Sequence, residues 1–101
     1  MVDNNTVMVD IVQGLTAAGV ECENVGGMFI GVSFDAPRRC GNHGHLLDGL
    51  MIELEGDSRA VTQPFFEGGA IGPDRVHESD NIGDVIVSFV KGVNSLPRLT
   101  D

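Results

Sequence analysis

Residues 28–35, MFIGVSFD, constrain the fold of this chain more than any other stretch. Apolar side chains fall at every second position, and smaller or polar residues lie between them, with Phe29 as the one exception. The apolar positions are Met28, Ile30, Val32 and Phe34. Alternation with a period of two is typical of a β-strand with one face in the core and the other in solvent. We therefore expect a half-buried strand here, with neighbouring segments as its partners.

The preceding residues predict the first of these partners. Alternation in residues 20–24 places Cys22 on the core side, as a small hydrophobic residue, and two glutamates on the other side. A two-residue glycine loop at 26–27 would set Glu23 opposite Ile30, which mixes charge into the apolar face. A three-residue loop at 25–27 instead pairs Cys22 with Ile30, so the pattern favours the odd-length loop.

Two more strands are expected further along the chain. Residues 46–55 alternate clearly, and residues 59–66 do so more weakly, with Pro64 marking either the end of that strand or a sheet edge. Their mutual register is left open by the pattern. Residues 36–45 and 67–78 are rich in glycine and proline without periodicity, which predicts loops.

Helical spacing of apolar residues marks both ends of the chain. Residues 4–19 and 80–96 each carry a stripe at intervals of three and four, which predicts amphipathic helices. A strand is the rival for the second segment because it is rich in β-branched residues, but alternation there would expose Ile86 and Val90. The predicted order is α-β-β-β-β-α. Residues 1–101 then form a single α+β domain, an antiparallel sheet with two helices packed on one face.

The charge balance narrows the choice of partners. The 101 residues include 15 acids and only 6 lysines and arginines, a formal net charge of −9. Such a protein repels phosphate backbones, so direct nucleic-acid binding is disfavoured. Three explanations of the acidity stay open: a solvated surface, adaptation to high salt, and a patch that meets a basic protein partner.

The start of the chain shows no basic and apolar signal sequence, and no stretch approaches the length of a membrane span. Two cysteines without an export signal favour reduced thiols. The expectation is a soluble cytoplasmic protein without a membrane partner.

A small group of metal-binding residue types lies at 40–45. Cys40, His43 and His45 could hold zinc, with Cys22, His77 or a carboxylate as a fourth ligand. The alternative is an ordinary exposed loop, because structural zinc sites usually have two pairs of ligands and only one group of donors is present.

Arg38 and Arg39 lie in the same segment. Beside the histidines they could hold a phosphate or an acidic group of a partner, or they could simply offset the local excess of acids. No nucleophile with an orienting carboxylate is evident, and the glycines at 68–72 lack the lysine and helix of a phosphate-binding loop. We therefore expect no enzyme.

Acidic side chains should gather on the open face of the sheet. If the strands are neighbours, four carboxylates line that face, with Phe29 at its margin: Glu21, Glu23, Glu53 and Glu55. This predicts a non-catalytic interaction protein (a regulator, adaptor or inhibitor, a role that a virus or mobile element could use) that docks a basic partner, or a homodimer seam. A solvated sheet face is the alternative.

Overall fold

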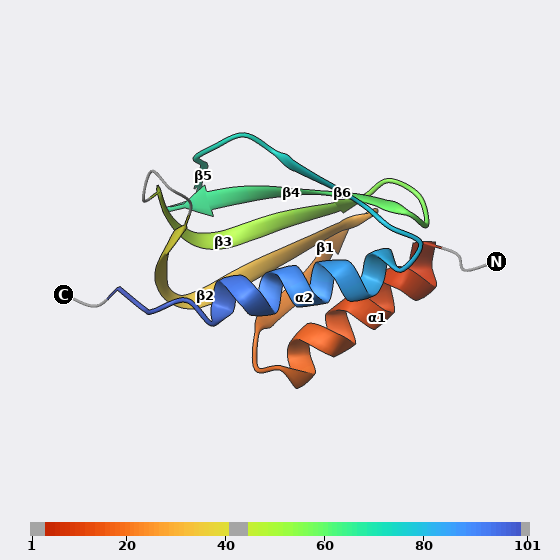
Figure 1. Ribbon diagram of the computed structural model, residues 1–101, viewed down its shortest axis with the longest axis horizontal. Helices are drawn as coiled ribbons and strands as arrows, with labels where there is room; N and C mark the ends of the chain where they lie inside the picture. The colour runs from red at the N-terminus through yellow and green to blue at the C-terminus, as the bar shows by residue number, and fades with distance from the viewer. Residues whose placement is uncertain (1–3, 41–44, 100–101) are drawn as a thin grey trace.

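The computed structural model describes residues 4–40 and 45–99 and arranges them as a curved antiparallel sheet over two helices (Figure 1). The elements in chain order are α1 (Asn4–Ala17), β1 (Glu21–Gly26), β2 (Phe29–Cys40), β3 (His45–Leu54), β4 (Arg59–Phe66), β5 (Gly69–Ala70), β6 (Arg75–Glu78) and α2 (Ile82–Asn94). Strands β1 to β4 are neighbours in sequence order, and β5 and β6 both pair with β4. The predicted α+β class is confirmed.

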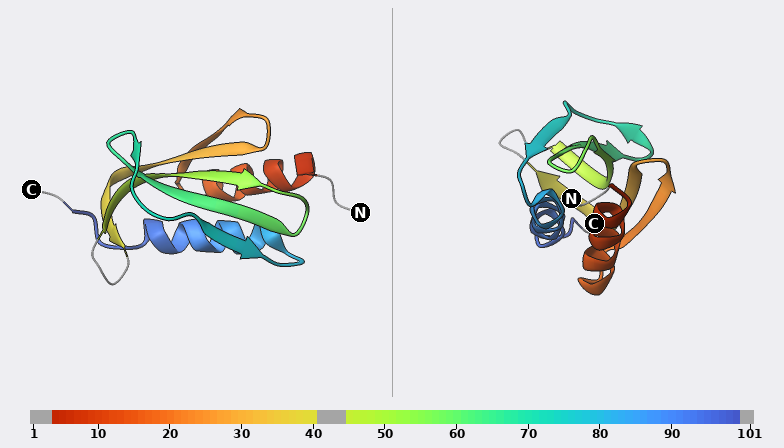
Figure 2. Two further views of the ribbon diagram at one scale, coloured as in Figure 1. Left: turned by 90° about the horizontal axis from the view of Figure 1, so that it is seen from above. Right: turned by 90° about the vertical axis from the view of Figure 1, so that its right-hand side faces the viewer.

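The alternating stretch at 28–35 forms the centre of the core as predicted. Ile30, Val32 and Phe34 are buried, whereas Phe29 is 40% exposed on the opposite face. Buried residues of β3 and of both helices meet the same side of the sheet: Leu50, Ile52, Leu54, Ile11, Leu15, Ile86 and Val90. Both helices therefore cover one face and leave the other face of β1 to β4 without a helical cover (Figure 2).

The helices follow the apolar stripes. In α2 the residues Ile82, Ile86, Val90 and Val93 are buried at helical spacing, so the strand alternative for residues 80–96 is wrong. Helix α1 ends at Ala17, and Gly19 follows with φ of +81°, a conformation that glycine adopts without steric cost.

The two segments expected to be loops contain strands, and those predictions are wrong. In the segment 36–45, β2 continues to Cys40 and β3 begins at His45, although an irregularity between Ser33 and Arg38 interrupts the β2–β3 ladder. In the segment 67–78, β5 and β6 pair with β4. Glycine and proline lower local strand preference, but pairing with existing strands overrides that preference.

The first hairpin is shifted by two residues from the predicted register. Cys22 lies opposite Val32 rather than Ile30, and the ladder shifts between Asn24 and Gly26. The extra residue at this bulge, Val25, replaces the odd residue that the predicted three-residue loop would have supplied. A shift by two leaves every side chain on its expected face, which is why the face was predictable and the register was not.

The register of the second hairpin, which the sequence left open, sets Leu50 opposite Pro64 and Ile52 opposite Thr62. The carbonyl of Pro64 accepts a bond from the Ile71 N–H at 3.1 Å, on the side away from β3. Pro64 thus lies within β4, between the segments that pair with β5 and β6, where its missing N–H points away from β3 and removes no bond to that strand. No helix in the described part of the chain is long and apolar enough to cross a membrane.

Candidate functional site

The open face of the sheet, opposite the helices, is built from rows of residues that run across four strands. The first row is Glu21, Ser33, Gly49 and Phe65, and the second row is Glu23, Gly31, Met51 and Gln63. The middle of the first row is Ser33 and Gly49, and the second row has Gly31 on β2. An acid stands at the β1 end of each row, and larger side chains stand toward β4: Met51, Gln63 and Phe65. This arrangement makes the face concave instead of flat.

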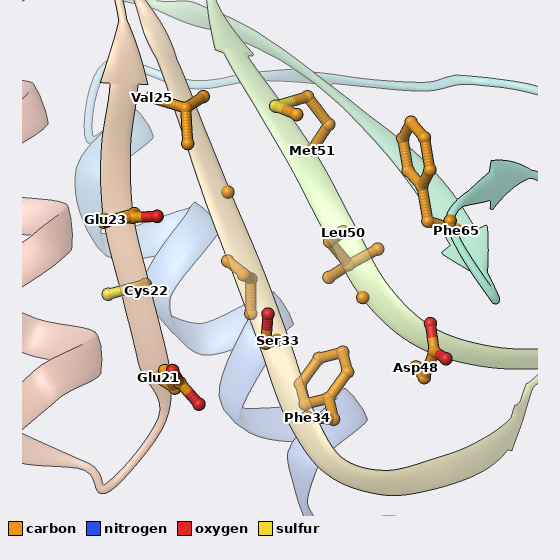
Figure 3. A pocket seen from close by; sticks show the side chains of 14 residues that line it. Glu21, Cys22, Glu23, Val25, Ser33, Phe34, Asp48, Leu50, Met51 and Phe65 are labelled. Carbon is orange, nitrogen blue, oxygen red and sulfur yellow. The ribbon is translucent and has the colours of Figure 1, made fainter.

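The hollow has a volume of about 590 Å³ and lies over β1, β2 and β3 (Figure 3). We call it the open-face groove. Gly31, Ser33 and Gly49 form its floor, and Met51 and Phe65 line the wall opposite β1. Its lining combines a floor of small residues and an apolar wall with carboxylates, two of them on β1, which are features that can hold an apolar side chain flanked by positive charge.

Two glycines keep the groove open. A Cβ at Gly31 would lie 3.1 Å from Cγ1 of Val25, whose side chain leans over that position. A Cβ at Gly49 would lie only 2.8 Å from the carbonyl oxygen of Val32 on the neighbouring strand. The β2–β3 register shifts between Ser33 and Arg38, directly after this close approach of the two backbones.

Three carboxylates line the groove: Glu21, Glu23 and Asp48 (Figure 3). Asp48 also accepts a hydrogen bond from the Glu67 backbone N–H at 3.2 Å, which ties the end of the groove to the β4–β5 turn. Glu21 and Glu23 were predicted for this face, whereas Asp48 was not. The whole chain carries a formal net charge of −9, which has the same sign as the carboxylates in the groove.

The other members of the predicted acidic face lie apart from the groove. Glu53 stands opposite Phe29 in the β2–β3 ladder, one row beyond Gly31 and Met51. Glu55 follows the end of β3 and forms an ion pair with Arg59 at 2.8 Å. Of the four glutamates and Phe29, only Glu21 and Glu23 line the groove.

The two arginines have different environments. Arg38 is only 2% exposed, and its guanidinium bonds to the carboxylate of Asp35 at 2.8 Å, to the carbonyl of Ala36 and to the carbonyl of Asn94. It also lies over the Phe34 ring, 5.7 Å from the centroid. Arg39 is exposed. Arg38 therefore links β2 to the carboxyl end of α2 and is not available on the surface to bind a phosphate or an acidic partner group.

Arg38 and Arg98 both affect the pKa of the Asp35 carboxyl. The hydrogen bond from Arg38, with the positive charge of Arg98 next to it, holds the pKa of Asp35 below its ordinary value, although loss of solvent opposes this effect. Arg98 lies 3.1 Å from the second carboxylate oxygen. Backbone pairing reinforces the link, because Arg98 bridges to Arg38 and the Leu99 N–H donates to Pro37 at 2.9 Å.

Of the three predicted metal ligands, Cys40 and His45 lie within the residues that the structure describes. Cys40 and His45 are opposite one another in the β2–β3 ladder, which brings two of the three residues to one place. His43 lies outside the described residues. Within residues 4–40 and 45–99, no three histidine, cysteine or acidic side chains gather closely enough to hold a metal ion.

His77, named as a further candidate ligand, is buried on β6. Its Nε2 lies 2.9 Å from the hydroxyl of Thr62, and its ring packs on Phe89 with centroids 4.8 Å apart. Burial, and secondly the charge of Arg75, lowers the pKa of His77 below its ordinary value. His77 is thus a hydrogen-bonded core residue on β6, whereas Cys22 lies on β1, at the opposite edge of the sheet.

The groove itself was missed at the sequence level, although a signal was present. Glycine or serine stands at the open-face positions 31, 33 and 49, where an ordinary half-exposed strand carries larger polar side chains. Comparison of the chain with protein-family models, with curated proteins and with solved structures finds no match. Its function is therefore inferred from the groove and the surfaces around it.

Proposed function

We propose that this protein is a non-catalytic interaction protein that binds a basic segment of a protein partner at the open-face groove. The observation that carries the proposal is the combination of a hollow of about 590 Å³ with three carboxylates, a floor of small residues and an apolar wall of Met51 and Phe65. A lysine or arginine side chain fits such a site with its aliphatic stem against Met51 and Phe65 and its charge near the carboxylates.

The charge of the chain supports the same partner. A net charge of −9 on 101 residues attracts cationic partners over a distance comparable to the Debye length, about 8 Å at physiological salt. Charges arranged in this way raise association rates and exclude acidic competitors more than they raise affinity. The residues that line the groove include the Ser33 hydroxyl but no histidine, lysine or arginine to activate it.

The proposal is tested by selecting binders from a random peptide library, once at moderate salt and once at high salt. We expect enriched peptides to be basic, and we expect Glu21→Lys and Glu23→Lys to reduce their capture by at least about tenfold each, since like charges replace opposite ones. Asp57→Lys and Glu78→Lys are matched controls, because both acids are exposed outside the groove.

Enrichment of neutral or acidic peptides, or equal losses in the groove and control variants, would refute the groove as the binding site. A solvated acidic surface without a specific site predicts a different result. Peptides would then be captured only below physiological salt, and all four lysine variants would reduce capture equally. These outcomes separate a specific site from a general effect of net charge.

Zinc binding by Cys40, His43 and His45 is the second candidate, and the pairing of Cys40 with His45 favours it. Its test is thermal unfolding with and without zinc, because a ligand that binds only the folded state raises the melting temperature. We expect a rise that Cys40→Ala abolishes. An unchanged melting temperature, with no zinc retained on dialysis, would exclude this function.

A further inference from the structure

Strand β1 is the last strand on its side of the sheet. It pairs with β2 only, and nearly all of its side chains are exposed. An edge strand carries a row of backbone N–H and C=O groups that another extended segment can pair with. The question is which groups this edge offers, and to what kind of segment.

The hydrogen-bond pattern of the sheet identifies the free groups. The Leu54 N–H donates to the carbonyl of Met28, so even-numbered residues of β2 bond to β3 and odd-numbered residues bond to β1. Glu21 and Glu23, opposite the odd-numbered residues of β2, therefore bond to β2. The N–H and C=O groups of Cys22 and Asn24 point outward.

No backbone bond from another element reaches these outward groups among residues 4–40 and 45–99. The Asn24 side-chain amide donates to the carbonyls of Gly27 and Phe29 at 3.1 and 2.9 Å and lies 2.7 Å from the sulfur of Met8 on α1. The Val20 N–H is already bonded to Leu15, and the bulge at Val25 interrupts the ladder. The regular part of the free edge is thus short, covering residues 21–24.

The two sides of this edge have opposite character. On the open side stand the carboxylates of Glu21 and Glu23. On the other side lies α1, which passes beside β1 away from β2 (Figure 3) and which Cys22 meets through its thiol, 3.7 Å from the Val12 carbonyl. The adjacent surface of α1 holds a second hollow of about 440 Å³, lined by Val9, Val12 and Asn24 among others, and Val9 is 51% exposed.

We propose that the partner segment binds as an added strand on β1, and that it alternates basic and apolar residues. Its basic side chains face Glu21 and Glu23 on the open side, and its apolar side chains pack on Val9 and Val12 of α1. The inference rests on the proposed function and specifies its binding mode: main-chain bonds supply affinity, and alternate side chains supply specificity.

Charge decides between such a partner and a second copy of the chain. A two-fold pairing of β1 with β1 would bring the glutamates of one copy against those of the other, between bodies that each carry a net charge of −9. Like charges directly opposite in a ladder are destabilising. A basic segment gains attraction at the same positions.

The test uses the full chain and a blocked seven-residue peptide that alternates lysine and valine. Amide hydrogen exchange is measured with and without the peptide. We expect protection of the Cys22 and Asn24 amides, at least about tenfold, because they gain partners. The Glu23 amide is an internal control, since it is already bonded to β2.

Two N-methylated peptides form the matched pair. In an antiparallel ladder, N-methylation of the valines removes the bonds to β1 and N-methylation of the lysines does not; in a parallel ladder the reverse holds. We expect the affinity to fall in only one of the two, by about 30-fold for two lost hydrogen bonds. Val9→Lys should weaken binding, whereas Val76→Lys on β6, where Val76 is 47% exposed, should not.

The outcomes separate this inference from the proposed function. If a basic peptide binds and Glu23→Lys weakens it, while both N-methylated peptides bind equally and the Cys22 and Asn24 amides stay unprotected, the edge inference fails and the groove remains. If no basic peptide binds, both fail. Protection of the same amides at high protein concentration without peptide, with a dimeric mass in solution, overturns the inference in favour of self-pairing.

Discussion

Gly49→Ala and Gly92→Ala make the same chemical change and should have opposite effects on stability. Gly49 lies on the floor of the open-face groove, where a Cβ would approach the Val32 carbonyl oxygen to 2.8 Å. Ordinary contacts of a Cβ begin near 3.4 Å, so β2 and β3 must separate locally by about 0.6 Å (3.4 − 2.8). The obstacle is backbone, which cannot rotate away as a side chain would.

The cost follows from what that separation disturbs. The Val32 oxygen faces β3, because even-numbered residues of β2 bond to that strand, and Leu50 is its partner. Overpacking in a well-packed region costs about 1–3 kcal/mol, and a weakened ladder bond adds up to about 1 kcal/mol. We expect Gly49→Ala to destabilise the fold by about 2–3 kcal/mol and to lower the melting temperature by roughly 10–20 °C.

Gly92 is the control. It lies in α2, is exposed, and has nothing within 4 Å of the position that a Cβ would take. Alanine is preferred to glycine in a helix by about 1 kcal/mol, so Gly92→Ala should stabilise the fold by about 0.5–1 kcal/mol.

The assay is urea unfolding of both variants and of the unchanged chain, followed by circular dichroism, with equal slopes against urea showing that the comparison is valid. A Gly49→Ala variant at least as stable as the unchanged chain would refute the close approach of β2 and β3. A gain in the control variant would show that the assay resolves effects of this size. Loss of peptide capture by Gly49→Ala at temperatures where it stays folded would connect the same glycine to the groove.

Three further perturbations test the core and its polar contacts. The lowered pKa of His77 means that its contribution to stability is complete above pH 6.5 and is lost as the pH falls below it; unfolding at pH 5 and 7.5 should show a drop that His77→Gln reduces, and an equal drop in both proteins would contradict this. Ile86→Ala should cost about 3 kcal/mol in urea unfolding, because Ile86 is fully buried between the helices and the sheet, and a cost under about 1 kcal/mol would be inconsistent with that burial. Arg38→Gln should cost about 2 kcal/mol through lost bonds to the Asn94 carbonyl, and a surface role without a structural one predicts no change.

Periodicity was sufficient to predict the elements that bury one face. The stripes at residues 4–19 and 80–96 and the alternation at 28–35 each place a continuous set of apolar side chains on one side, and burial of those sets determines the layers. The predicted order of helix, strands and helix, with both helices on one face, follows from this alone. Only the helix ends differ by a few residues, where capping and fraying decide.

Tertiary pairing explains the strands that were missed. Residues 36–40 extend β2 because Arg38 anchors them to the end of α2 and because the chain near Arg98 pairs alongside. β6 forms because Val76 and His77 find partners on β4, where His77 also gains a bond to Thr62. These contacts join residues far apart in the sequence and do not require apolar residues to alternate locally. The glycine-rich and proline-containing segments therefore showed no strand pattern.

The register of β1 shows the same limit, and it bears on function. Burial distinguishes one face from the other but cannot distinguish two registers that differ by two residues, so the bulge at Val25 was not predictable. That bulge limits the regular edge to residues 21–24 and places the Val25 side chain over Gly31 at the mouth of the groove. The small residues at 31, 33 and 49 leave a concave surface beside the unpaired edge of β1, and at Gly49 the nearby Val32 carbonyl also excludes a larger residue. Larger side chains in the groove and a covered β1 edge would make the fold more stable and less prone to aggregate. A protein that binds a partner segment there must keep both the groove and the edge open.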